Sequence, residues 1–188
     1  MTRSGDEAKR RLQEAALDLF TERGFDQTSA ADIAARAGVT ERTFFRHFTD
    51  KREVFFDGQA ELLDTLIGAL AAEPSGTRPM PALRAAFHAA VPLLERNLPV
   101  VKTRIPVITA TPALRERSLA KTQALVEALT AALATRGVSA HLAELCAQTA
   151  MVTFQAAVRR WHEDPSTGPH EHLDNAFRDL RLATNALK

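Results

Sequence analysis

Cationic and hydroxyl side chains crowd a short stretch of the chain between residues 36 and 52. The whole chain of 188 residues carries a formal net charge of only +1, and residues 1–57 hold ten basic and eleven acidic side chains. A general basic coat is therefore excluded, and the local excess predicts a narrow contact face for the phosphates and base edges of DNA. The cations of this stretch are Arg36, Arg42, Arg46, Lys51 and Arg52.

Two short helices joined by a tight turn would position these side chains. The first would begin at Ser29, which with Asp32 three residues later has the pattern of a capping box. Gly38 stands where the chain must turn, a place at which glycine adopts a positive φ at low cost. Thr40 would then cap a second helix. Such a helix-turn-helix predicts that the second helix enters the major groove of DNA.

A helical hairpin inside an all-α core would also fit this pattern of helix, glycine and helix. The concentration of positive charge favours DNA binding over that alternative. Phe44 and Phe48 are predicted to be core side chains, because they fall on the side of the second helix opposite Arg42 and Arg46. An apolar stripe predicts a preceding helix that packs behind the pair, and its members are Leu12, Ala15, Ala16, Leu19 and Phe20.

Three stretches carry a resemblance to a known family, namely Ala16–Phe25, Asp32–Thr40 and Arg46–Lys51. Through them, about residues 6–57 resemble the TetR family of one-component transcriptional regulators. The resemblance implies a three-helix DNA-binding domain, with base contacts from Thr40, Arg42 and Thr43 and phosphate contacts from Ser29, Phe45, His47 and Lys51. With the outward polar positions added, the expected DNA-binding residues are Ser29, Thr40, Glu41, Arg42, Thr43, Phe45, Arg46, His47 and Lys51.

The similarity has departures. Relatives commonly have tyrosine where Phe45 stands, and this chain contains no tyrosine, so a phenolic hydrogen bond to phosphate is missing. Ala30 and Ala31 are also smaller than the side chains of many relatives. The form of residues 40–48 resembles an actinobacterial branch that includes mycofactocin-associated regulators, whose ligands are acyl-coenzyme A species.

The chain is predicted to be all-α, with a helix-turn-helix DNA-binding domain over residues 1–50 and a larger ligand-binding and dimerisation domain over residues 51–188. All nine prolines lie from Pro74 onward, and no alternating pattern indicates a strand. Asp50 and Glu53 are predicted to start a continuous helix to about Ala72 that links the two domains. The further helices are expected at 82–98, 100–110, 112–136, 139–163 and 171–186.

A small-molecule pocket is expected in the second domain. Pro92 and Pro106 fall inside helical patterns and are predicted to kink or break them, which opens space in the interior. A curved core helix without a ligand remains an equal alternative. The candidate lining combines apolar walls with one cation and one amide, which suits an amphipathic or anionic ligand. Its members are Phe87, Val91, Arg104, Ile108, Val126, Met151, Phe154 and Gln155.

The helix expected over residues 139–163 is apolar on two opposite faces. A single small domain covers one face, so the other is predicted to pack on a second copy of the chain. The resemblance implies the same, because TetR-like proteins dimerise through their last two helices. The residues expected at the dimer interface are Leu145, Thr149, Val152, Ala156, Phe177 and Leu180.

No constellation of side chains indicates an enzyme, a cofactor or a metal site. Cys146 lies in an apolar pattern, and His170 and His172 flank Glu171 without a third ligand at suitable spacing. No stretch is apolar over the length that spans a membrane, and a cytoplasmic protein is expected. The predicted function is a homodimeric repressor that an effector releases from an inverted-repeat operator. An effector-independent DNA-binding protein and a helical enzyme with a borrowed motif remain alternatives.

Overall fold

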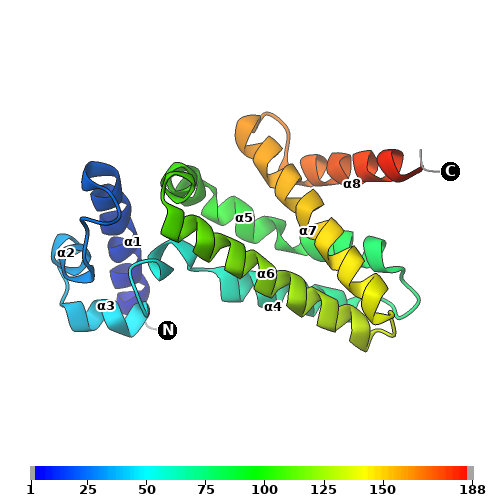
Figure 1. Cartoon of the computed structure of the whole chain (residues 1–188), viewed down its shortest axis with the longest axis horizontal. Helices are drawn as coiled ribbons and strands as arrows, with labels where there is room; N and C mark the ends of the chain where they lie inside the picture. Colours follow the sequence, from blue (N-terminus) through cyan, green and yellow to red (C-terminus); the bar gives the residue numbers. More distant parts are fainter. Residues whose placement is uncertain (1–2, 186–188) are drawn as a thin grey trace. The chain divides into compact units, whose positions relative to one another are not determined.

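The computed structural model describes residues 3–185, except for the side chains of residues 3, 4, 6 and 97–103. Within this part of the chain every regular element is a helix (Figure 1), which confirms the predicted all-α class. The elements are α1 (Arg3–Arg23), α2 (Ala30–Arg36), α3 (Glu41–His47), the 3-10 helix η1 (Glu53–Phe56), α4 (Gln59–Ala72), α5 (Pro79–Ala110), α6 (Pro112–Thr135), α7 (Ala140–Glu163) and α8 (Pro169–Asn185).

The described residues pack as two compact units. The first unit contains the chain up to Gly58 together with Pro99–Ala120. The second contains Gln59–Leu98 and the chain from Lys121 onward. Helices α5 and α6 therefore each contribute one end to the first unit and the other end to the second.

Large aromatic side chains fill the core of the first unit. The predicted apolar stripe of α1 is buried, and so are Phe44 and Phe48, as their positions on α3 indicated. The ring of Phe20 stacks on that of Phe55, with centroids 5.1 Å apart and planes 12° apart. A unit of this size buries little surface per residue, so such aromatic rings supply a large part of its stabilisation.

The continuous helix predicted over residues 50–72 is wrong, because the chain forms η1 and α4 with a break between them. Asp50 does cap the first piece, since its Oδ1 accepts hydrogen bonds from the backbone amides of Arg52 and Glu53. The break follows at Asp57, which is extended, and at Gly58, whose φ is +88°. A residue with positive φ cannot continue an α-helix. In addition, Gln13 Nε2 donates a hydrogen bond of 2.9 Å to Asp57 Oδ2, which fixes Asp57 within the first unit.

The two helices predicted over 82–98 and 100–110 are one helix, α5, which runs through Pro92, Pro99 and Pro106. A proline removes one backbone hydrogen bond, but its φ suits a helix. Buried side chains hold the helix on both sides of Pro92, with Phe87 and Val91 in the core of the second unit and Arg104 buried in the first. Packing therefore outweighs the lost hydrogen bonds.

The core of the second unit lies among α4 to α8. The rings of Phe87 on α5 and Phe154 on α7 stack at its centre, with centroids 4.4 Å apart. Ser139 precedes α7, at the expected start of the 139–163 helix, but its side chain makes no capping hydrogen bond. None of the described helices combines the length and apolar character needed to cross a membrane.

Candidate nucleic-acid interface

The start of α2 is fixed by the capping box that the sequence predicts. The backbone amide of Ser29 donates to Asp32 Oδ2 at 2.8 Å, and the amide of Asp32 donates to Ser29 Oγ at 3.1 Å. The Ser29 hydroxyl also donates to the Asp32 carboxylate. These bonds, with that from Arg23, lower the pKa of Asp32 to about 2. The hydroxyl proton of Ser29 is therefore engaged inside the domain.

Replacement of this serine is expected to weaken the first unit. Ser29→Ala should lower the free energy of unfolding by about 1 kcal/mol at neutral pH, the usual effect of losing an N-cap side chain. Because Asp32 has a depressed pKa, its contribution is complete above the unfolded value near 3.9 and is lost as the pH falls through about 2.

Urea unfolding of the full chain between pH 2 and pH 7 measures this effect. The difference between wild type and Ser29→Ala should shrink in the acid range. Ser118→Ala, a substitution inside α6, is the matched control and should not lower stability. A difference between wild type and Ser29→Ala that stays constant down to pH 2 would show that the two side chains do not act together.

The turn between α2 and α3 also forms as predicted. Gly38 has a φ of +67°, and the backbone amide of Val39 donates to Ala34 O at 3.0 Å. Thr40 caps α3, because its Oγ1 accepts a hydrogen bond of 3.2 Å from the backbone amide of Thr43. The two threonine hydroxyls lie 3.0 Å apart, so both are held at the N-terminus of α3.

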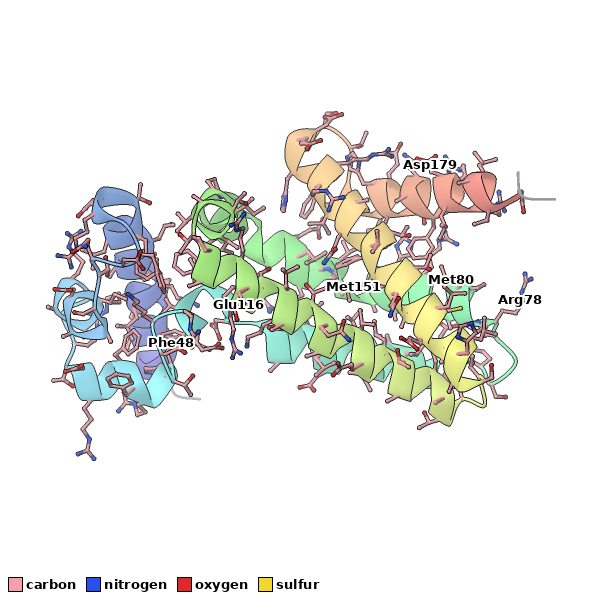
Figure 2. All side chains as sticks on the ribbon, viewed as in Figure 1. Phe48, Arg78, Met80, Glu116, Met151 and Asp179 are labelled. Atoms are coloured by element: carbon pink, nitrogen blue, oxygen red, sulfur yellow. The ribbon has the colours of Figure 1, made fainter. Side chains whose placement is uncertain are left out.

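The two sides of α3 differ in character. Phe44 is fully buried and Phe48, labelled in Figure 2, closes the C-terminal end of the helix inside the core. Glu41, Arg42 and Arg46 are exposed on the other side. Since the buried residues anchor the helix from behind, the exposed guanidinium groups project into solvent from a fixed support.

Most cations around α3 already have partners in the same unit. Arg36 makes a two-pronged ion pair with Glu22, at 2.9 and 2.8 Å, and this hydrogen bonding lowers the pKa of Glu22. Arg52 pairs with Asp50 at 2.8 Å. Within the part of the chain that the structure describes, Arg42 and Arg46 make no ion pair. These two guanidinium groups are the cations most available to phosphates and bases.

Lys51 has a structural role that the sequence did not indicate. Its Nζ donates hydrogen bonds to Phe25 O at 2.7 Å and Thr28 O at 2.9 Å, and it lies 4.1 Å from the centre of the Phe25 ring. Lys51 thereby holds the loop between α1 and α2. Phe45 is exposed and His47 is half-buried.

The first unit also recruits the adjoining ends of α5 and α6, which sequence spacing did not reveal. Arg117 on α6 forms an ion pair with Glu53, and Leu114 is fully buried in the aromatic core. Arg104 is buried, its Nη1 lies 3.4 Å from Phe55 O, and its burial lowers its pKa. Arg104 and Phe55 are 49 residues apart in the sequence, and Arg117 and Glu53 are 64 residues apart. No local sequence pattern therefore predicts these contacts.

The residues proposed for a ligand pocket fall into separate groups. Arg104 and Ile108 belong to the first unit, and the other six residues belong to the second. Phe87, Val126 and Met151 are buried in the core of the second unit. Gln155 lies there as well, 3.3 Å from the hydroxyl of Thr122, to which its amide donates.

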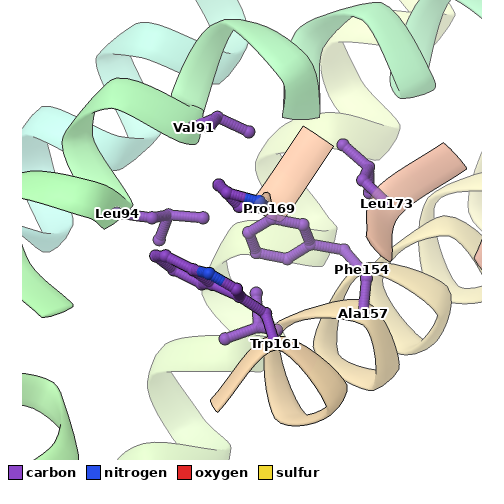
Figure 3. A pocket seen from close by; sticks show the side chains of 8 residues that line it. Val91, Leu94, Phe154, Ala157, Trp161, Pro169 and Leu173 are labelled. Atoms are coloured by element: carbon purple, nitrogen blue, oxygen red, sulfur yellow. The ribbon is translucent and has the colours of Figure 1, made fainter. Parts of the chain in front are cut away.

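Only Val91 and Phe154 of that group line a small cavity in the second unit (Figure 3). Its free volume of about 10 Å³ is room for a single water molecule. The indole of Trp161 and the side chain of Leu94 close one side of it. The complete lining is Val91, Leu94, Phe154, Ala157, Val158, Trp161, Pro169 and Leu173.

The proposed dimer residues lie on a face of α7 and α8 that retains exposed apolar surface. Leu145 is 54% exposed and Val152 is 63% exposed, whereas Trp161 on the other face of α7 is buried. The remaining four positions are half-buried, namely Thr149, Ala156, Phe177 and Leu180.

The histidines near α8 are engaged in hydrogen bonds. His170 Nδ1 lies 2.7 Å from His88 Nδ1, and His88 Nε2 lies 2.7 Å from the carboxylate of Asp174, which also pairs with Arg84. His172 Nε2 bonds the hydroxyl of Thr167. Among the described residues, no group of three or more histidine, cysteine, aspartate or glutamate side chains could hold a metal ion.

Helix α3 is capped at its N-terminus, packs on the core through Phe44 and Phe48, and exposes two arginines. This arrangement is typical of helix-turn-helix transcriptional regulators. Residues 12–57 match the family model of bacterial regulatory proteins of the TetR type. Residues 77–184 match the model of the MftR C-terminal domain. The chain belongs to the TetR family of DNA-binding transcriptional regulators, with a C-terminal domain of the MftR type.

Individual relatives agree with this assignment. The chain is 28% identical to MftR of Mycobacterium tuberculosis, named for the regulation of mycofactocin biosynthesis, over 88% of this chain and 85% of that protein. It is 38% identical to the regulator TcmR of Streptomyces glaucescens, but over 39% of this chain and only 33% of TcmR. The crystal structure of Thermus thermophilus FadR, a TetR-family repressor in complex with lauroyl-CoA, is 21% identical, has a TM-score of 0.54, and the match covers 90% and 91% of the two chains.

Proposed function

We propose that this regulator is a homodimeric repressor that binds an inverted-repeat operator and leaves it when a small-molecule effector binds. The observation that carries the DNA-binding part is the exposed side of α3, where Arg42 and Arg46 lack ion pairs within the described chain. In this proposal residues 1–50 read DNA, and residues 51–188 bind the effector and form the dimer.

The side chains of α3 divide into two groups by the contacts that they suit. Arg42 projects from the first turn of the helix and is proposed to bind a guanine edge. The hydroxyls of Thr40 and Thr43, which share a hydrogen bond, are proposed to contact neighbouring bases. Arg46 lies one turn further on and is proposed to neutralise a phosphate. Ser29 and Lys51 already make hydrogen bonds within the first unit, and His47 is half-buried. We propose that these three residues stabilise the helix-turn-helix and make secondary phosphate contacts.

The salt dependence of operator binding measures how many phosphates the protein neutralises. Two cations in each subunit are proposed to contact phosphate, Arg46 and Lys51, and together they give a slope of about −4 in log affinity against log salt, from about 0.9 per contact. A slope of about −7 would mean that paired arginines such as Arg36 exchange their carboxylates for phosphates. A slope near zero would contradict a contact through these cations.

Dimerisation is proposed to use the exposed apolar face of α7 together with α8. Leu142, Leu145 and Val152 would lose their contact with water when a second copy packs on them. Two reading helices held in this way would bind half-sites about 34 to 36 Å apart, or a longer multiple of the helical repeat. Each copy then adds its own base and phosphate contacts, which raises the affinity for a symmetric site.

The effector is proposed to be amphipathic or anionic, with an acyl-coenzyme A as the first candidate. The FadR repressor was solved with lauroyl-CoA, and the cavity of this chain is walled by Phe154, Trp161 and other apolar side chains. Because it has room for one water molecule, an acyl chain would have to displace these side chains to enter. A coupling of about 1 to 3 kcal/mol would then release the operator.

Thermal unfolding and operator binding test the effector part of the proposal. Lauroyl-CoA at 100 times its dissociation constant should add about 2.7 kcal/mol to the stability of the protein. It should also weaken operator binding by about 5- to 150-fold. Coenzyme A without the acyl chain is the matched control. If no acyl-CoA species of a wide panel changes the stability or the operator affinity, the result would favour an effector-independent DNA-binding protein. Chemical turnover of any of these species would favour a helical enzyme.

A further inference from the structure

An exposed aromatic ring stands among the charged side chains of α3. Phe45 is 52% exposed, whereas its neighbour Phe44 is fully buried. The two rings meet edge to face, with centroids 5.3 Å apart and planes 84° apart. This contact anchors Phe45 from behind, so its free side is presented to solvent in a defined orientation.

The position of Phe45 places it within the surface proposed to enter the groove. At 100° per residue, it lies about 60° from Arg42 and about 100° from Arg46 on the helix, and all three are exposed. An aromatic ring has no group that binds a phosphate oxygen. Its contribution to a DNA complex must therefore come from apolar contact.

The major groove offers one apolar group on a base edge, the C5 methyl of thymine. We propose that Phe45 is a specificity-determining residue, which selects thymine at one position of each half-site by packing its ring against this methyl group. The proposal rests on the proposed function, because it requires α3 to lie in the major groove. It goes beyond that function by assigning sequence preference to a side chain without a hydrogen-bonding group.

The burial of one methyl group sets the size of the effect. Removing the methyl from the contacted thymine should weaken binding by about 3- to 5-fold for one half-site. Removing it from both half-sites of a dimer should weaken binding by about 10- to 20-fold, since distant contacts are nearly additive. A ring that instead lay along the sugars would give no dependence on a single base.

The test replaces each thymine of a selected operator with deoxyuridine, which removes the methyl group and leaves every hydrogen-bonding group unchanged. Wild type should show one sensitive thymine in each half-site. Phe45→Ala should bind the thymine and deoxyuridine operators equally, and Phe45→Tyr, which keeps the ring, should retain the preference. Wild type is itself the first readout, so the test does not depend on how the variants fold.

Three results would overturn the assignment. Specific binding by wild type with no sensitive thymine would remove the role of Phe45 and leave the proposed function intact, as would a sensitivity that Phe45→Ala retains unchanged. Failure of wild type to select any duplex sequence would end both the assignment and the proposed function. The two kinds of failure are therefore distinguishable.

Discussion

The double variant Arg42→Ala with Thr43→Ala should lose at least about 100-fold in operator affinity, because each lost base contact is worth about 1 to 3 kcal/mol and a dimer loses two copies of it. Arg42 is exposed and Thr43 half-buried on α3, and neither contributes a buried apolar group to the core. The Thr40 cap survives, since Thr40 Oγ1 bonds the backbone amide at position 43. The loss should therefore appear in binding, with little change in folding.

Fluorescence anisotropy with a labelled operator measures the loss, and circular dichroism checks that the helices remain. Arg96→Ala is the matched control, because Arg96 is an exposed arginine that pairs with Glu61 in the second unit. Its removal subtracts the same charge and should leave operator affinity within about 2-fold of wild type. Unchanged binding by the double variant would mean that α3 is not the reading element.

The double variant Leu145→Glu with Val152→Glu should dissociate the dimer. Both side chains are more than half exposed in the single chain, so their replacement costs little in the folded subunit. In a two-fold interface, four carboxylates would face one another away from water. An expected penalty of about 4 kcal/mol raises the dimer dissociation constant about 1,000-fold.

Analytical ultracentrifugation at micromolar concentration measures this change, and operator affinity should fall with it. Leu119→Glu is the control, because Leu119 is 72% exposed on α6 and lies outside the α7 and α8 face. It introduces one carboxylate per subunit at an apolar surface position and should leave the dimer intact. A Leu145→Glu and Val152→Glu variant that sediments as wild type would place the interface elsewhere.

Features that depend on local spacing could be predicted from the sequence. The Ser29–Asp32 box, the left-handed Gly38 and the Thr40 cap each follow from residue types a few positions apart, and all three are present. The spacing of apolar residues likewise predicted that α7 has two opposite apolar faces. One of these faces is buried, and Leu145 and Val152 on the other face are exposed.

Features that depend on distant packing could not be predicted in the same way. No sequence pattern predicted that the ammonium group of Lys51 donates hydrogen bonds to two carbonyls of the loop before α2. The contacts of Arg104 with Phe55, which is 49 residues away in the sequence, were equally unpredictable. The break between η1 and α4 has one local sequence signal, which is Gly58. Glycine adopts the positive φ found there more readily than any other residue.

Two copies of α3, each presenting Arg42 beside Thr40 and Thr43, are proposed to bind the two halves of a symmetric site. Selection of bound duplexes from random DNA by the purified full chain measures this binding. We expect recovery of an inverted repeat whose half-site centres are about one helical turn, or a multiple of it, apart. Recovery of sequences with no shared motif would contradict this proposal.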